Sequence, residues 1–167
     1  YRESTVDPLT KLINRRVLLR LAQRSHEYHE VYSVVMFDLD RFKRINDNYG
    51  HAVGDQFLVA VAKVIKKELR TTDIIARFGG EEFVALLPNT SISQAKMIAE
   101  RFRASVEEYP WKISHDSGEP FTISVSIGVA NSVDFSSEEL SDLAIIINKS
   151  DSLLYQAKDQ GRNKVCT

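Results

Sequence analysis

Apolar residues along the chain follow two periodicities, one typical of strands and one typical of helices. An apolar run over 33–38 and an alternating run over 121–130, with its odd positions facing inward, predict buried strands. Two shorter runs over 73–78 and 83–88 flank a Gly-Gly pair. They predict a β-hairpin, because tight hairpin turns need residues that accept positive φ.

Four longer stretches carry apolar residues at the i, i+3, i+4, i+7 spacing of helices packed against a core. These helices are expected over four ranges: 14–28, 55–69, 93–109 and 137–159. Asn14 and Ser93 have the side chains that cap helix N-termini. The glycines at 50 and 54 predict a loop before the second of these helices.

Shorter segments complete the predicted order of elements. Residues 41–47 are expected to form a short helical turn, 111–113 an edge strand, 114–120 a loop and 163–166 a closing strand. The order predicts an α+β fold, an α/β sandwich with a central, mainly antiparallel sheet flanked by helices. It is close to the ferredoxin-like β-α-β-β-α-β plan.

Length and composition suit one globular domain spanning residues 1–167. Of the 167 residues, 43% are hydrophobic and 27% are charged, which allows one full core. The chain begins at Tyr1 and reaches motif-like sequence almost at once. We therefore expect it to be the C-terminal part of a longer regulatory protein.

Charge and cysteine content bound the partners and the compartment. The net charge of −1 gives no global basic field, so neither nucleic acid nor an acidic membrane surface is an expected partner. No apolar run approaches the ~18 residues of a membrane span, and no membrane contact by this segment is expected. The single cysteine, Cys166, fits a reducing compartment. We expect a cytoplasmic domain, whether or not the full protein is anchored in a membrane.

Four carboxylates are predicted at a strand end and a hairpin tip: Asp38, Asp40, Glu81 and Glu82. If the strands are neighbours, these acids converge, which is costly unless a cation compensates. Oxygen ligands with open positions suit Mg²⁺ shared with substrate phosphates, and this predicts a phosphoryl or nucleotidyl transfer site. The alternative is that Asp40 and one glutamate are surface charges. That alternative is favoured for Asp40 but not for Asp38, which ends an apolar strand.

Basic and polar residues near these acids have two interpretations each. Lys43 could face a bound phosphate or be a surface lysine, and Lys158 and Arg162 could form a phosphate clamp or complement a helix dipole. Asn46 and Asp55 could hydrogen-bond a guanine edge. They could equally be a turn residue and an N-cap.

Several motifs occur together, in this order: Asp7-Pro8-Leu9-Thr10 through Asn14-Arg15-Arg16, Phe37-Asp38-Leu39-Asp40-Arg41-Phe42-Lys43 with Asn46-Asp47, Gly50-His51 with Gly54-Asp55, Gly79-Gly80-Glu81-Glu82-Phe83, and Tyr155-Gln156-Ala157-Lys158 with Gly161-Arg162-Asn163. In order and spacing this set resembles the bacterial GGDEF family of diguanylate cyclases. The resemblance implies a palm related to nucleotidyl cyclases. It also implies a nucleotidyltransferase that condenses two GTP into the second messenger cyclic di-GMP, with release of two pyrophosphates.

The resemblance also implies roles for individual residues. Mg²⁺, with Mn²⁺ as a substitute, would be held by Asp38, the main-chain carbonyl of Leu39, and Glu81. Glu81 would also accept the 3′-hydroxyl proton, while the separate role of Glu82 is open. The remaining substrate contacts implied are Phe42, Lys43, Asn46, His51, Asp55, Gly79, Gly80, Lys158 and Arg162. Because each protomer supplies one half-site, the active form would be a homodimer.

An Arg-x-x-Asp segment, Arg70 to Asp73, resembles the family's inhibitory site for the cyclic di-GMP product, and Arg101 is a candidate second contact. The alternative is a helix-ending arginine and a loop aspartate. Two other functions are alternatives to an active GTP-specific cyclase. One is a catalytically silent module that binds GTP or cyclic di-GMP and regulates a neighbour. The other is a cyclase that also accepts ATP, which the carboxylate of Asp55 opposes.

Overall fold

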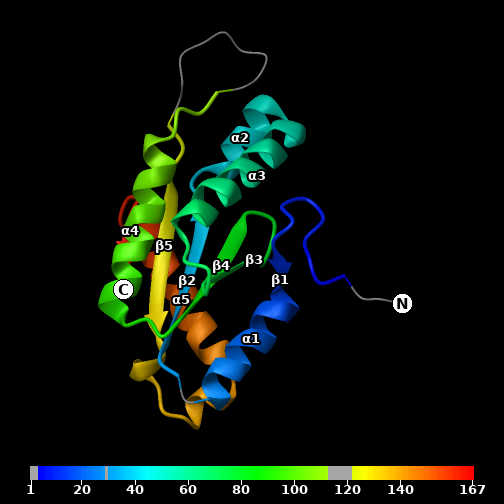
Figure 1. The fold of residues 1–167 in the computed structure, drawn as a ribbon. Helices are drawn as coiled ribbons and strands as arrows, with labels where there is room; N and C mark the ends of the chain where they lie inside the picture. The colour runs from blue at the N-terminus through cyan, green and yellow to red at the C-terminus, as the bar shows by residue number, and fades with distance from the viewer. Residues whose placement is uncertain (1–3, 29, 113–121) are drawn as a thin grey trace.

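The computed structural model describes residues 4–28, 30–112 and 122–167, which form one mixed sheet with helices on both faces (Figure 1). The six strands are β1 (Ile13–Asn14), β2 (Tyr32–Leu39), β3 (Ile74–Arg77), β4 (Glu82–Pro88), β5 (Val125–Asn131) and β6 (Val165–Cys166). The helices are α1 (Arg15–Glu27), α2 (Phe42–Tyr49), α3 (His51–Glu68), α4 (Ile92–Glu108) and α5 (Ala144–Asp159), with 3₁₀ turns η1 (Ser132–Asp134) and η2 (Glu139–Ser141). No described helix is both long enough and apolar enough to cross a membrane.

The strand order is β1-β3-β4-β2-β5-β6. The four central strands pair antiparallel, in the order of a ferredoxin-like sheet, and this confirms the predicted fold. β1 and β6 add parallel edges, beside β3 and β5 respectively. The closing strand was predicted, whereas β1 was not, because two residues carry no periodicity.

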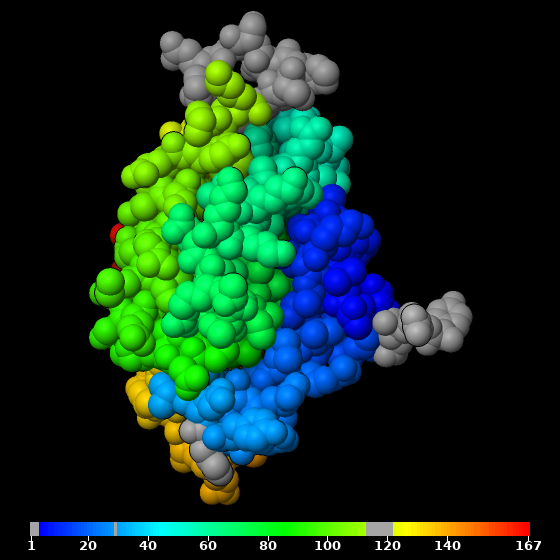
Figure 2. All heavy atoms as spheres, viewed as in Figure 1, coloured from blue at the N-terminus to red at the C-terminus, as the bar shows by residue number. Residues whose placement is uncertain are grey.

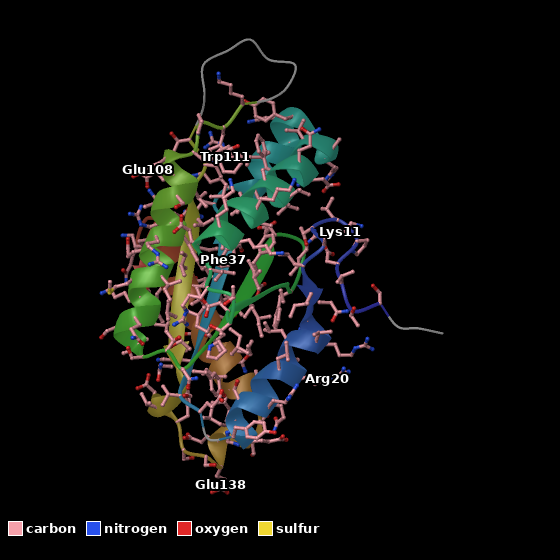
Figure 3. The ribbon with its side chains drawn as sticks, in the orientation of Figure 1. Lys11, Arg20, Phe37, Glu108, Trp111 and Glu138 are labelled. Atoms are coloured by element: carbon pink, nitrogen blue, oxygen red, sulfur yellow. The ribbon has the colours of Figure 1, made fainter. Side chains whose placement is uncertain are left out.

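Two hydrophobic clusters hold the sheet between its helical layers. One joins β2, β4 and β5 to α3 and α4, and the other joins the same strands to α1 and α5. Figure 2 shows α3 and α4 covering the front, with the N-terminal segment and α1 beside α3. In the front cluster Phe37 stacks on Phe83 at 5.3 Å between ring centroids and meets the edge of Phe102 at 6.0 Å (Figure 3). Every residue of β2 is buried, so this strand is the centre of the fold.

Helix caps explain where α1 and α4 begin. Asn14 caps α1 as predicted, and its side chain accepts a hydrogen bond from the amide of Val17. The predicted cap Ser93 is wrong, since α4 begins after Ser91. Ser91 and Gln94 form a capping box, in which each side chain bonds the other's main-chain amide.

The predicted glycine loop before α3 is also wrong. Only Gly50, at φ +87°, separates α2 from α3, and α3 begins at His51. Gly54 is buried inside α3, where an added Cβ would lie 1.9 Å from Oδ1 of Asn46 on α2. The absence of a side chain at 54 therefore lets the two helices pack together. Asp55 lies within α3 and is not an N-cap.

The strand predicted over 121–130 begins later and is buried on both faces. β5 starts at Val125, and its odd positions face α3 and α4 as predicted. Its other face packs against α5, which begins at Ala144, later than predicted. Of the predicted edge strand 111–113, Trp111 is buried and donates its indole N–H to Val106. Ile113 and the predicted loop 114–120 lie outside the described residues.

Candidate active site

Acidic residues from two strands meet at one edge of the sheet. Asp38 near the end of β2 is the register partner of Glu82 at the start of β4, so their side chains share a face. Asp38 is only 7% exposed, and its Oδ2 accepts a hydrogen bond from Nζ of Lys158 at 2.5 Å. Glu81, half-buried at the hairpin tip, lies close enough to repel both carboxylates. The predicted hairpin thus brings three of the four acids together.

Burial makes this acidic edge costly. Burial raises the pKa of Asp38 to about 7, an effect that Lys158 opposes and that Glu81 and Glu82 reinforce. Burial also raises the pKa of Glu82, with a further contribution from Asp151. These carboxylates are therefore short of positive charge, as expected for a site that takes up a cation.

The raised pKa of Asp38 predicts how the metal-free domain responds to pH. Between its ordinary pKa of 3.8 and its folded value of about 7, the folded state holds a proton that the unfolded state has lost. The free energy of unfolding should fall by ~4 kcal/mol as pH rises across that window, and then level off. Urea unfolding in a chelator at pH 4 to 8 measures this. Asp38→Asn is the control, because it cannot titrate; parallel profiles for the two proteins would contradict the prediction.

The donor atoms at this edge fit a hard cation. Oδ1 of Asp38 is buried and accepts no hydrogen bond from any described residue. Among the described residues, no three His, Cys, Asp or Glu side chains are grouped closely enough to hold a metal by themselves. A cation here would therefore draw further oxygens from the main chain and from substrate phosphates, as Mg²⁺ commonly does.

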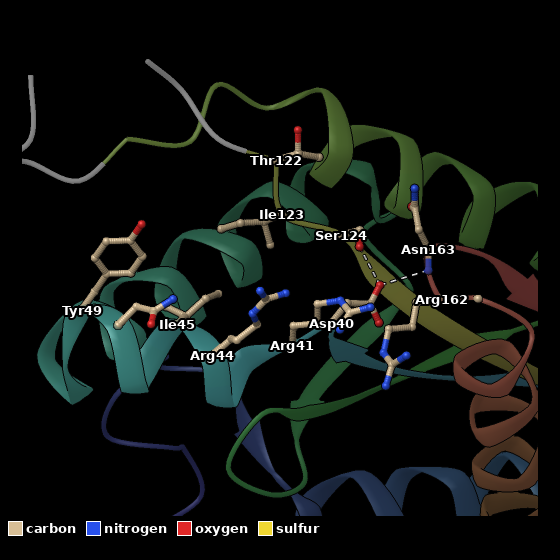
Figure 4. Close-up of a pocket in the computed structure, with 12 residues that line it drawn as sticks. Asp40, Arg41, Arg44, Ile45, Tyr49, Thr122, Ile123, Ser124, Arg162 and Asn163 are labelled. Atoms are coloured by element: carbon tan, nitrogen blue, oxygen red, sulfur yellow. Dashed lines mark hydrogen bonds between the residues drawn. The ribbon is translucent and has the colours of Figure 1, made fainter. Parts of the chain in front are cut away.

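The basic side chains predicted to contact phosphates lie on α2, in the last turn of α5 and just after α5. Lys43 is exposed on the first turn of α2, and Arg162 follows α5. Arg162 lines a cavity of about 330 Å³ together with Arg41 and Arg44 (Figure 4). Lys158 is in the last turn of α5, but its bond to Asp38 shows that it does more than complement the helix dipole.

The polar residues predicted for guanine lie on the α2–α3 pair. Asn46 faces Gly54 between the two helices, and its Oδ1 is buried without a hydrogen bond from a described residue. His51 and Asp55 are exposed on the first two turns of α3. Phe42 is buried at the start of α2, where it packs in the front cluster.

The hairpin tip differs from the expected turn. Gly79 and Gly80 are exposed, and neither has positive φ, so the reason given for these glycines is wrong. A Cβ on Gly80 would meet no atom within 4 Å, and one on Gly79 would meet only Cβ of Glu82, at 3.8 Å. The fold itself does not require glycine at either position.

Arg77, which sequence reasoning missed, holds the hairpin tip. Its guanidinium donates to the carbonyls of Gly79 at 3.1 Å and Gly80 at 2.7 Å. It also pairs with Asp7 at 3.2 Å, and Asp7 in turn accepts from the amide and hydroxyl of Thr10. The N-terminal motif is thereby tied to the hairpin. The position of Arg77, two residues before the first glycine, was a signal that could have indicated this role.

Asp40 is not the surface charge that the sequence favoured. It is 8% exposed and accepts hydrogen bonds from both Ser124 and Ser126, at 2.6 Å each. Ser126 is on β5, Ser124 lies just before it, and a third donor, the amide of Asn163, lies beyond α5. Asp40 therefore has different partners from Asp38, two residues earlier.

The Arg-x-x-Asp segment forms a compact ion pair. Arg70 donates to Asp73 through Nε and through an NH₂ group at 2.7 Å, and it also reaches Oγ1 of Thr90 at 2.5 Å. Arg101 pairs with Glu68 at the end of α3, at 3.6 Å. The candidate inhibitory residues thus lie where α3 ends and β3 begins, at the opposite end of β3 from the hairpin tip.

The fold and the site define a class of domain: an α+β domain with a ferredoxin-like centre and paired carboxylates beside basic side chains. The sequence model of the family described as "Diguanylate cyclase, GGDEF domain" matches residues 4–164. The chain belongs to the GGDEF family.

Individual relatives agree with this assignment. The chain is 47% identical over 141 residues to diguanylate cyclase A of Treponema denticola, covering 84% of this chain and 36% of that protein. It is 40% identical over 167 residues to diguanylate cyclase DgcP of Pseudomonas aeruginosa, covering 98% of this chain and 24% of that protein. The chain therefore spans about a quarter to a third of the length of these two relatives.

Solved structures show the same fold. The GGDEF domain of DgcB from Caulobacter crescentus, in complex with c-di-GMP, is 30% identical with a TM-score of 0.87, and the match covers 99% of this chain and 96% of that one. The active GGEEF domain of a diguanylate cyclase from Vibrio cholerae is 33% identical with a TM-score of 0.78, covering 93% of this chain and 96% of that one.

Proposed function

We propose that this domain condenses two GTP molecules into cyclic di-GMP and two pyrophosphates, in the cytosol, with Mg²⁺ or in its place Mn²⁺. The observation that carries the proposal is the buried, unpartnered Oδ1 of Asp38, at an edge shared with two glutamates and beside Lys158. The relatives named diguanylate cyclases support it.

The metal would be held by Asp38, the main-chain carbonyl of Leu39, and Glu81. When bound, Mg²⁺ supplies positive charge that acidifies the attacking 3′-hydroxyl and neutralises the phosphates. Glu81 accepts the hydroxyl proton, because an alcohol is a weak nucleophile at neutral pH. Glu82 stands beside them and adds negative charge to the cation site.

Basic residues serve the triphosphate. Negative charge builds on the α-phosphate in the transition state, and cations placed there stabilise it. Lys43 is the residue assigned to this charge, while Lys158 and Arg162 hold the rest of the triphosphate. The fold does not require glycine at positions 79 and 80. The absence of side chains there leaves the hairpin backbone open to the nucleotide.

The α2–α3 pair selects guanine. Asn46, His51 and Asp55 contact the base side of the substrate, with Phe42 beneath them. A carboxylate at Asp55 accepts hydrogen bonds from N1–H and the exocyclic amine of guanine. Adenine presents an acceptor at N1, so ATP is opposed.

Two domains must face one another, because each domain holds one GTP and each new phosphodiester bond joins the two nucleotides. A C₂ homodimer provides two equivalent half-sites. Activity would then depend on how tightly two copies of the domain associate.

The proposal is tested by incubating the chain with GTP and Mg²⁺ and measuring cyclic di-GMP and pyrophosphate chromatographically. Fusion to a parallel two-stranded coiled coil keeps two copies together, so weak association cannot hide activity. Product from GTP and little from ATP is expected. A fused dimer that binds GTP but forms no cyclic di-GMP would instead identify a binding module.

We further propose that cyclic di-GMP inhibits the domain by binding at Arg70 and Asp73, with Arg101 as a second contact. Arg70→Ala should then raise the inhibitory concentration of added cyclic di-GMP at least about tenfold, the loss expected for a charge-assisted contact, while turnover persists. Arg101→Ala is the matched arginine variant and should give a smaller increase. Equal inhibition of Arg70→Ala and the parent would rule out this site.

A further inference from the structure

Asp40 is a buried carboxylate that binds three donors. Oδ1 accepts from Oγ of Ser126, and Oδ2 accepts from Oγ of Ser124 and from the main-chain N–H of Asn163 at 3.0 Å. Asp40 makes no ion pair within the part of the chain that the structure describes. These three hydrogen bonds satisfy the buried carboxylate, and one of the donors, Asn163, belongs to the turn after α5.

That turn has an unusual backbone. Gly161, Arg162 and Asn163 have consecutive φ values of +113°, +67° and +48°. Non-glycine residues seldom adopt this left-handed region, so surrounding contacts must hold them there. The amide of Arg162 donates to the carbonyl of Ala157 at 2.9 Å, and the amide of Asn163 donates to Asp40.

The side chain of Asn163 is held as well, from α4. Its Oδ1 accepts from Arg103 at 3.1 Å, and its Nδ2 donates to Glu107. Asn163 is therefore held through its backbone by Asp40, directly after β2, and through its side chain by α4. Because Arg162 is one residue earlier, these bonds also fix the position of its backbone.

The guanidinium of Arg162 makes no hydrogen bond or ion pair with another described residue. It lies on the wall of the cavity that Asp40, Arg41 and Arg44 also line (Figure 4). Its own side chain does not fix its place, so the backbone of the turn does.

We propose that Asp40 is a positioning residue that holds the 161–163 turn and so places Arg162 on the triphosphate. The proposal rests on the assignment of Arg162 to the phosphates under the proposed function. It gives the two neighbouring aspartates separate roles: Asp38, near the end of β2, faces the cation, and Asp40, directly after β2, holds the cationic turn. The metal side and the phosphate side of the site are thereby both tied to the end of one buried strand.

The test compares the Kd of a non-reactive α,β-methylene analogue of GTP with the Kd of GMP, both in Mg²⁺. Asp40→Ala should weaken analogue binding about tenfold, the typical loss of a charge-assisted contact, and leave GMP binding unchanged. Arg162→Ala should do the same, and the double variant should be no weaker than Arg162→Ala alone. Additive losses, or equal loss of both ligands, would overturn the proposal in favour of a purely structural role.

Two further readouts separate this proposal from the proposed function and from misfolding. Amide hydrogen exchange at Asn163 needs no nucleotide: Asp40→Ala should speed it markedly, and unchanged protection would overturn the proposal even if the parent binds no GTP. If Asp40→Ala does not fold, Asp40→Asn replaces it, since the amide keeps one acceptor oxygen. A loss of analogue binding confined to the triphosphate is again expected, and unchanged binding would overturn it.

Discussion

Replacing Glu81 by glutamine should lower the rate of cyclic di-GMP formation about a thousandfold, within the range lost when a general base is removed. Glutamine has the same shape as glutamate, but it neither accepts the hydroxyl proton nor carries the negative charge that attracts Mg²⁺. Glu81 is half-buried at a hairpin tip and makes no hydrogen bond with a described side chain, so the fold should tolerate the change. Single-turnover rates at saturating GTP and Mg²⁺, on the coiled-coil dimer, measure the effect.

Glu82→Gln is the matched control for this experiment. Glu82 begins β4 directly across from Asp38, and its charge is felt by Arg15 and Asp151 of the rear helices. We expect the loss of this charge to lower the rate of cyclic di-GMP formation about tenfold, because one nearby charge is removed while the proton acceptor remains. Activity that survives in Glu81→Gln but disappears in Glu82→Gln would exchange the roles of the two glutamates.

Hydrophobic periodicity predicted the helices that bury one face and the strands that are buried on both faces. The run ending at Asp38 was identified as a buried strand because the residues before Asp38, from Val34 to Phe37, are all apolar. Antiparallel pairing of β2 with β4 then placed a hairpin acid beside Asp38. The carboxylate edge was therefore predicted on the condition that these two strands are neighbours, and the structure meets that condition.

Features that depend on tertiary contact could not be predicted from local pattern. Gly54 indicated a loop, and only its distance to Asn46 shows that a helix–helix contact requires it. Asp40 carries the same charge as Asp38. Nothing local reveals that its partners are Ser124 just before β5, Ser126 within β5 and an amide more than 120 residues away. A polar residue's burial is decided by its partners, which periodicity does not specify.

Replacing Gly128 by alanine should destabilise the domain by about 3 kcal/mol or more, at the upper end of overpacking changes. Gly128 is in the middle of β5, where α5 crosses the sheet. An added Cβ would lie 2.1 Å from the carbonyl oxygen of Ser150 and 2.3 Å from the amide of Leu154. Because both atoms belong to the helix backbone, no rotamer change relieves the contact, and α5 must move away from β5. Chemical denaturation measures the loss, and the melting temperature should fall by about 8 °C.

Gly80→Ala is the matched glycine variant, and it should separate stability from function. An added Cβ at Gly80 would meet no atom within 4 Å, and Gly80 has no positive φ. The free energy of unfolding of the domain should therefore change by less than about 0.5 kcal/mol. If the hairpin backbone is open for a nucleotide, the same methyl group should nevertheless weaken GTP binding. Glycine would then be required at position 128 for packing against α5 and at position 80 for binding the substrate.

A Gly128→Ala protein as stable as the parent would show that α5 can shift without cost, and the rigid placement of Lys158 beside Asp38 would have to be abandoned.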